Sequence, residues 1–373
     1  MAGIYLHIPF CKQACHYCNF HFSTSVKYKE EIVAAMLREL ELQKDYLRGE
    51  AIETIYFGGG TPSLLNQRDL DLFFNKLISN FSISNFKSLE ITLEANPDDL
   101  NFQKIKELKS TPINRLSIGV QSFFEKDLKF MNRAHNASEA EACIKIAQDN
   151  GFENLTIDLI YGSPATPDIN WIKNIEKAID FNIPHLSCYC LTVEEKTALA
   201  HFVKTGKTKP VDEEQAARQF NILINKLNAN NYEHYEISNF AKKGFYSKHN
   251  SSYWQGKKYL GVGPSAHSFN GTSRQWNIAN NAKYMQALKE NKLNKELEIL
   301  TPEQQYNEYV MTALRTMWGI DFLKIKNMGR GDYFIKNIKT YMEQGLVFEK
   351  NGNYTLTDKG KFLADGIAAG LFL

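Results

Sequence analysis

The chain has 373 residues, and 43% of them are apolar, so it can bury the core of one large domain or of one large and one small domain. Its 44 Lys and Arg residues nearly balance 42 Asp and Glu residues, and the net charge of +2 argues against a nucleic-acid-binding surface. No apolar run approaches the roughly 18 residues that a membrane span requires. We therefore expect no transmembrane segment and no nucleic-acid partner.

Short apolar runs alternate with helical patterns through the first part of the chain. Strands are predicted at residues 4–8, 52–57, 89–94, 115–120, 156–161 and 185–192. Helices are predicted at residues 28–46, 67–80, 101–109, 138–150 and 169–181. Strands that alternate with helices are typical of parallel βα units, whose right-handed crossovers form a complete or an open, incomplete barrel. We therefore expect an α/β fold.

The later part of the chain changes character twice. A long helix near residues 212–230 begins with acidic side chains, which favour a helix N-terminus, and residues 235–276 are rich in glycine and aromatic residues. From Thr301 a new helix begins with a proline in its first turn, and Asn351-Gly352 predicts a hairpin. Helices followed by a hairpin suggest a winged-helix-like module. Because this module has no basic stripe, we expect a lid or packing role.

These patterns predict three parts. Residues 1–235 would form the barrel, residues 236–300 an aromatic and Gly-rich extension, and residues 301–373 the C-terminal helical, winged-helix-like domain.

Cys11, Cys15 and Cys18 bring three thiols close together near the start of the chain. Three thiolates can hold three corners of a cubane iron–sulfur cluster, and an incomplete ligand set leaves one position open for chemistry. The spacing differs from the paired Cys-x-x-Cys of zinc ribbons, so zinc or a disulfide is the weaker alternative. Such thiolates favour a reducing, cytoplasmic compartment. The other cysteines are expected to be small buried residues: Cys143, Cys188 and Cys190.

The run at residues 4–10, followed by the three cysteines, resembles the radical S-adenosylmethionine (SAM) superfamily. Within it, the segment is similar to the branch that contains oxygen-independent coproporphyrinogen III oxidase and the HemW-type heme chaperones. The resemblance implies a partial (β/α)6 barrel with a wide lateral opening. It also implies a 4Fe–4S cluster on Cys11, Cys15 and Cys18, with SAM bound to the open iron and cleaved to a radical when the cluster is reduced.

Polar residues follow the predicted strands where such a site would need them. In parallel barrels, ligand-binding groups gather at the carboxyl ends of the strands. The run Gly58-Gly59-Gly60-Thr61 follows the second strand, and glycines let a main chain approach a ligand without Cβ collisions. Taken singly, each polar residue has an alternative role as a strand-end cap or in a surface ion pair. The resemblance implies SAM contacts by Tyr5, Tyr17, Gly59, Gly60, Thr61, Glu94, Gln121, Arg133 and Asp158.

This chain differs from the oxidase family at two places, which disfavours the oxidase function. Its family carries a fourth cysteine where this chain has Phe20, and a longer arm than the ten residues that precede Cys11 here. The run from His249 to Tyr253-Trp254 resembles the His-Asn-x-x-Tyr-Trp motif of the HemW-type proteins, which implies that His249 ligates heme iron. The alternative is that these aromatic residues only pack the late segment onto the barrel.

The resemblance covers nearly the whole chain and implies a cytoplasmic heme chaperone that binds a 4Fe–4S cluster, SAM and heme. Its partners would be an electron donor for the cluster and an unidentified heme acceptor protein. Whether SAM is cleaved, and hence whether the protein is an enzyme, stays open. The main alternative is an oxygen-independent coproporphyrinogen III oxidase of porphyrin biosynthesis. A nucleic-acid-modifying radical enzyme is disfavoured by the charge balance.

Overall fold

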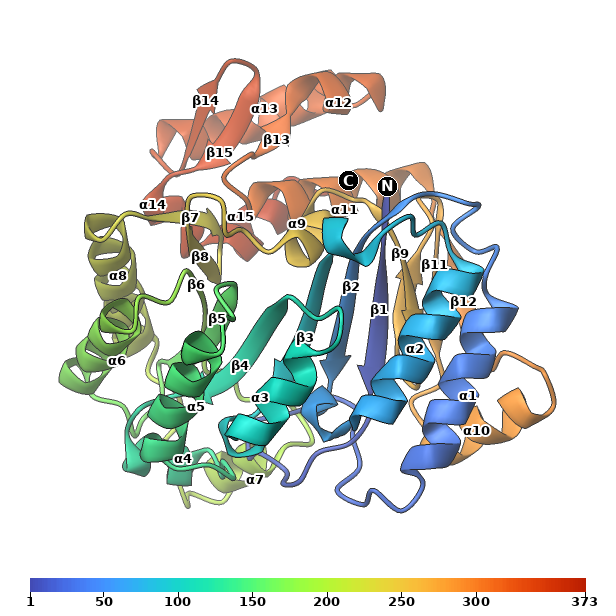
Figure 1. Cartoon of the computed structure of the whole chain (residues 1–373). Coiled ribbons are helices and arrows are strands. Elements are labelled where there is room, and N and C mark those ends of the chain that lie inside the picture. The colour runs from blue at the N-terminus through green and yellow to red at the C-terminus, as the bar shows by residue number, and fades with distance from the viewer.

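A computed structural model describes all residues, 1–373, and confirms the α/β fold. Six parallel strands lie side by side in chain order, and the helices that connect them lie along one face of the sheet (Figure 1). The strands are β1 (Ala2–Ile8), β2 (Ile52–Gly59), β3 (Glu90–Ala95), β4 (Arg115–Gln121), β5 (Leu155–Tyr161) and β6 (His185–Cys190). The helices are α1 (Lys29–Leu42), α2 (Gln67–Asn80), α3 (Phe102–Lys109), α4 (Glu125–Phe130), α5 (Ala137–Asp149) and α6 (Asp168–Asp180).

The sheet continues beyond both edges of this partial barrel to twelve strands. After α7 (Ala198–Lys204) and α8 (Glu213–Ala229), the antiparallel strands β7 (Tyr232–Glu236) and β8 (Asn239–Lys242) join the edge at β6. Strand β9 (Lys258–Val262) pairs with β1 and is parallel to it. The sheet then continues through β10 (His267–Phe269), β11 (Ser273–Asn277) and β12 (Lys295–Ile299). The stretch from 235 to 276 therefore contributes several strands to the sheet, with helix α9 (Lys248–Trp254) between β8 and β9.

Two helices accompany this extension. Helix α10 (Asn281–Lys289) contacts α1. Helix α9 (Lys248–Trp254) contacts β1 and β2 and lies near the end of the sheet where β1 begins (Figure 1). The loop that carries the three cysteines follows β1 and therefore lies at the opposite end.

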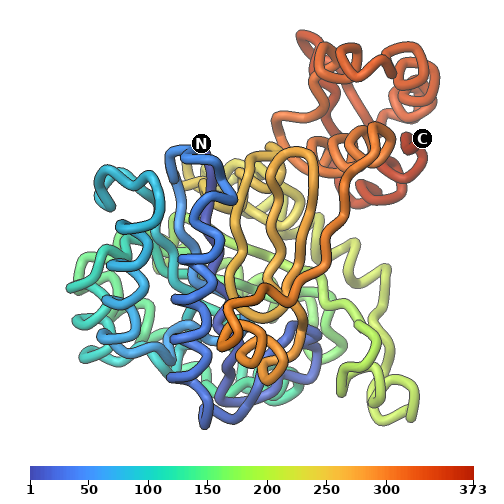
Figure 2. The backbone as a smooth tube through the Cα atoms, turned by 90° about the vertical axis from the view of Figure 1, so that its right-hand side faces the viewer, coloured from blue at the N-terminus to red at the C-terminus, as the bar shows by residue number.

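The C-terminal segment stands apart from the barrel (Figure 2) and packs around its own core of 16 buried residues between Tyr306 and Leu371. Its three-stranded sheet has the order β13-β15-β14. Its elements are α11 (Pro302–Leu314), β13 (Ile320–Asp321), α12 (Phe322–Asn327), α13 (Gly331–Glu343), β14 (Val347–Lys350), β15 (Asn353–Leu356), α14 (Asp358–Lys361) and α15 (Ala364–Ala369). No helix in the chain is long and apolar enough to cross a membrane.

A buried carboxylate ties the extension to the barrel. Glu39 of α1 is fully buried, and its two oxygens accept hydrogen bonds from the Gly263 amide (2.9 Å), Asn277 (2.7 Å), Tyr284 (2.5 Å) and Gln43 (2.8 Å). Burial raises the pKa of Glu39 above its ordinary value. Because three of these donors lie beyond β9, the carboxylate fixes the position of the whole extension against α1.

Replacing Glu39 with alanine should therefore lower the free energy of unfolding by at least about 2 kcal/mol, because each buried donor left without an acceptor costs about 1–3 kcal/mol. Urea unfolding of the full chain measures this. The matched control is Glu31→Ala, an exposed position on the same helix, which should change stability by less than about 0.5 kcal/mol. Equal effects of the two substitutions would contradict the anchoring role of Glu39.

Candidate functional site

A cavity of about 410 Å³ lies at the carboxyl ends of the parallel strands, next to the cysteine loop. Residues from every strand end from β2 to β6 reach its wall, as the parallel arrangement requires. The structure brings together here all the predicted cluster and SAM residues except Tyr5. They are Cys11, Cys15, Cys18, Tyr17, Gly59, Gly60, Thr61, Glu94, Gln121, Arg133 and Asp158.

The cysteine loop is held at its base and at its middle. At the base, the Ser23 amide donates to the Pro9 carbonyl (2.9 Å) and the Cys11 amide donates to the Ser23 carbonyl (3.0 Å). At the middle, the His16 amide donates to the Met131 carbonyl (3.1 Å). The loop is thus attached to the turn after α4, which also carries Arg133.

The guanidinium of Arg133 joins this loop to two strands. Its Nη1 lies 3.2 Å from the Cys15 sulfur, and its Nη2 donates to the Asn96 side chain and to the Gly119 carbonyl, both at 2.6 Å. Its buried Nε has no partner in the protein. A half-buried guanidinium beside the thiols, with its Nε unpaired, suits an anionic group such as a carboxylate.

Two half-buried carboxyl groups, Glu94 and Asp158, also line the cavity. Glu94 accepts hydrogen bonds from the Tyr56 hydroxyl (2.7 Å) and from the Gly59 amide (3.1 Å). Burial raises the pKa of Glu94 to about 7 and that of Asp158 to about 6. Their negative charges repel each other, which adds to the shift at Glu94. Such carboxyl groups favour a cationic or hydroxyl-bearing ligand, which would hold them in the charged form.

The glycines at positions 59 and 60 are needed because the chain at the end of β1 packs closely against them. A Cβ on Gly59, whose φ is +104°, would lie 2.6 Å from the His7 ring. A Cβ on Gly60 would lie 2.5 Å from the Phe10 carbonyl oxygen. The interpretation that glycines here make room for a ligand is therefore incomplete, since the collisions they avoid are with the chain itself.

Gln121 sits in a strained backbone conformation at the end of β4. Its φ is +65°, and the pairing of β4 with β5 shifts register between Ile118 and Gln121. A left-handed conformation costs a residue with a side chain on the order of 1–3 kcal/mol and is concentrated at functional sites. The bulge places the Gln121 side chain on the cavity wall.

Tyr5 and His249 lie in the barrel interior instead, where a smaller chamber of about 210 Å³ shares Glu94 and Asp158 with the first cavity. The Tyr5 ring is 6.0 Å from the Tyr56 ring, and its hydroxyl lies 3.2 Å from Nδ1 of His7. Tyr5 does not line the cavity next to the cysteine loop, so the geometry does not support a direct contact of Tyr5 with a ligand bound there.

Both ring nitrogens of His249 are occupied. Nδ1 lies 2.7 Å from the Thr54 hydroxyl, and Nε2 lies 2.8 Å from the Tyr253 hydroxyl. The ring stacks on Tyr56 at 4.9 Å, and burial lowers the pKa of His249 to about 3. In this conformation neither nitrogen is free to bind iron, and His249 instead holds Tyr253 in place.

Sequence reasoning missed several residues of these walls. Asn96 lies two residues after Glu94, at the end of β3, and this position at a strand end could have indicated a place in the site. Arg115 is a charged residue at the start of an apolar strand; its side chain is buried and makes no hydrogen bond or ion pair with the protein. Tyr189 lies at the end of β6 and lines the cavity. Only the alternation of side chains along the strand indicates in the sequence that it faces inward.

The three cysteines suit a cluster better than a single ion. No group of three or more His, Cys, Asp or Glu side chains is arranged to hold one metal ion. In a cubane cluster each cysteine binds a different iron, so its sulfur ligands are spread around the cluster rather than around one point. Three cysteine side chains on the wall of one cavity, with Arg133 beside Cys15, fit this arrangement.

Comparisons with known proteins agree with this geometry. The model of the radical SAM superfamily matches residues 5–178. The chain is 32% identical to the heme chaperone HemW of Bacillus subtilis, over 98% of both chains, and 31% identical to HemW of Lactococcus lactis, over 97% of both. Its fold is similar to that of coproporphyrinogen III oxidase (HemN) of Escherichia coli, with a TM-score of 0.85 and 22% identity over 100% of this chain and 90% of that one. The chain belongs to the HemW family within the radical SAM superfamily.

Proposed function

We propose that this protein is a heme chaperone that binds a 4Fe–4S cluster, SAM and heme, and transfers heme to an acceptor protein. The observation that carries the proposal is the single cavity that unites the three cysteines with Arg133, Glu94 and Asp158, in a chain that HemW relatives match over almost its full length. A cytoplasmic location agrees with cysteines that must stay reduced.

In this proposal Cys11, Cys15 and Cys18 hold the cluster. Arg133 binds the carboxylate of the methionine moiety, and Glu94 and Asp158 bind cationic or hydroxyl groups of SAM. The cluster, when bound, supplies the electron that can cleave SAM. Glu94 and Tyr56 also connect the cofactor cavity to the other end of the barrel, because Tyr56 bonds Glu94 and stacks on His249. This contact chain supports a role of the cluster and SAM as a gate on heme transfer.

The structure of the chain supports the division proposed from the sequence only in part. Residues 236–300 share both the sheet and the main core with residues 1–235, through side chains such as Leu260 and Tyr284. Residues 301–373 have their own core. We propose that this last part is a packing or lid module.

The alternative, an oxygen-independent coproporphyrinogen III oxidase, is favoured only by the similarity of fold. Phe20 stands where the oxidase family carries its fourth cysteine, and its side chain is 67% exposed. Anaerobic incubation with coproporphyrinogen III, SAM and a reductant should give no protoporphyrinogen, whereas a heme titration should saturate near one equivalent. Formation of protoporphyrinogen would support the oxidase instead.

Replacing Cys15 with alanine should remove the cluster. After anaerobic reconstitution, iron content should fall from about four atoms per chain to less than about one, with loss of the visible absorption. Cys143→Ala is the matched control, because that thiol is buried on α5, and it should keep its iron. Zinc in the wild-type protein, or full iron content in Cys15→Ala, would rule out the proposed cluster.

Replacing Glu94 with glutamine should weaken SAM binding about tenfold or more, because hydrogen bonds to charged groups are worth about 1.5–3 kcal/mol. Calorimetry with the reconstituted protein measures this. The pKa of Glu94 is raised to about 7 and that of Asp158 to about 6, so lowering the pH from about 8 to about 6 should weaken SAM binding more in the wild type than in the variant, where only Asp158 still titrates.

The exposed Glu153 provides the control, since Glu153→Gln should leave both the affinity and its pH dependence unchanged. If Glu94→Gln and Arg133→Ala both bound SAM as the wild type does, the proposed SAM contacts would be wrong.

A further inference from the structure

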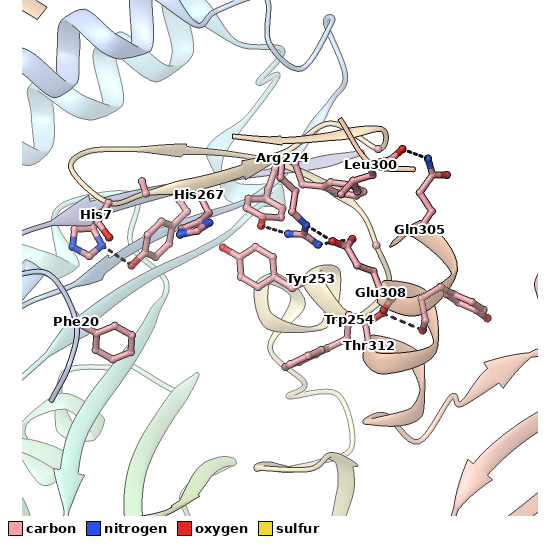
Figure 3. Close-up of a pocket in the computed structure, with 18 of the residues that line it drawn as sticks. His7, Phe20, Tyr253, Trp254, His267, Arg274, Leu300, Gln305, Glu308 and Thr312 are labelled. Carbon is pink, nitrogen blue, oxygen red and sulfur yellow. Dashed lines mark hydrogen bonds and ion pairs between the residues drawn. The ribbon is translucent and has the colours of Figure 1, made fainter. Parts of the chain in front are cut away.

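A second cavity, of about 740 Å³, lies between the β9–β11 extension and the C-terminal helices α11 and α12 (Figure 3). Its volume falls within the range of small-molecule sites, about 300–1,000 Å³. Aromatic rings line much of it. The rings of Tyr253 and Tyr259 meet edge to face at 4.5 Å, and Tyr259 lies 6.4 Å from Phe269. A planar, largely apolar ligand fits such walls.

His267 of β10 is an exposed side chain on the wall of this cavity, and neither of its ring nitrogens has a hydrogen-bond partner in the protein. The other histidines here are engaged: Nδ1 and Nε2 of His7 lie 3.2 Å from the Tyr5 hydroxyl and 2.9 Å from the His21 carbonyl oxygen. Nε2 of His21 lies 2.7 Å from Asn281.

Positive charge is available on the far side of the cavity. Arg274 is neutralised by a two-point ion pair with Glu308 (Figure 3), with N–O distances of 2.6 and 2.8 Å. The Lys324 ammonium lies over the Tyr309 ring, 3.9 Å from its centre, and pairs with no carboxylate of the protein. It can therefore bind a carboxylate of the ligand.

The cavity adjoins the cofactor site. Asn19 and Phe20, directly after Cys18, line both cavities. A ligand here would contact the cysteine loop, and it would also contact Tyr253 and Trp254 of the motif on α9.

We propose that this cavity is the heme site, with His267 as an axial ligand and Lys324 bound to a propionate. The inference rests on the proposed heme chaperone function and changes the role of His249 from ligand to positioning residue, since His249 holds Tyr253 against the cavity. Tyr253, Tyr259 and Phe269 contact the faces and edges of the macrocycle.

Heme titration of the full-length protein, followed by absorbance, tests this proposal. His267→Ala should weaken binding by at least about tenfold, because even partners outside the first shell of a metal are worth about 10- to 100-fold. It should also shift the heme absorption band, and added imidazole should restore the wild-type spectrum. His249→Ala should weaken binding while leaving the axial-ligand spectrum unchanged. The control is His201→Ala, which removes an exposed histidine on α7 and should change neither the heme affinity nor the spectrum.

A second pair of variants tests the propionate contact without touching the iron. Lys324→Ala should weaken binding severalfold, whereas Lys326→Ala, an exposed lysine on the same helix that does not line the cavity, should have no effect. Unchanged iron content after cluster reconstitution verifies that each variant is folded.

The outcomes separate the two proposals. If the wild type bound no heme, the proposed function would fail. If the wild type bound heme and His267→Ala bound it with equal affinity and the same spectrum, this site would be wrong while the function stood. A changed axial-ligand spectrum in His249→Ala alone would restore His249 as the ligand.

Discussion

The contacts of Arg133 hold the candidate cofactor site together. One guanidinium bonds the sulfur of Cys15, the side chain that follows β3 and the main chain of β4. The cysteine loop has no regular secondary structure between Cys11 and Cys18. Its position therefore depends on such side-chain and main-chain bonds, of which those to the turn after α4 are the most extensive. The geometry of the three thiols depends on this connection together with the bonds at the base of the loop.

A second constraint acts along the barrel interior. Parallel strands bring Tyr5 of β1 and Tyr56 of β2 side by side, and their rings fill the space between the carboxyl-end cavity and the His249 helix at the other end. The segment from His249 to Trp254 is thus in contact with the candidate cofactor site through packed side chains, although it lies far from the cysteines in the sequence. The polar interior, with the unpaired Arg115, sets this barrel apart from one filled by apolar layers.

Much of this architecture was predictable from the sequence, because apolar periodicity and the order of strand and helix are local signals. The six strands and the connecting helices other than α4 follow from apolar periodicity. The convergence of Glu94, Gln121 and Asp158 follows from the rule that parallel strands share one carboxyl edge. The pairing of β9 with β1 was not predictable, since it joins residues about 250 positions apart and depends on the buried Glu39. The inward position of Tyr5 and the occupied nitrogens of His249 also escaped prediction, because a residue type does not reveal its hydrogen-bond partners.

The separately packed C-terminal core has a mechanical consequence. One wall of the aromatic cavity, with Lys324 and Met328, belongs to the C-terminal body, whereas the wall that carries His267 belongs to the barrel extension. The two bodies are joined by the Arg274–Glu308 ion pair and by main-chain hydrogen bonds from Ile237 to Arg315 and from Met317 to Tyr235. The cavity therefore lies at the boundary between two bodies with separate cores, and a change in their relative position would change its width. Such a change would leave the twelve-stranded sheet intact, because the strands of the C-terminal body form a separate sheet.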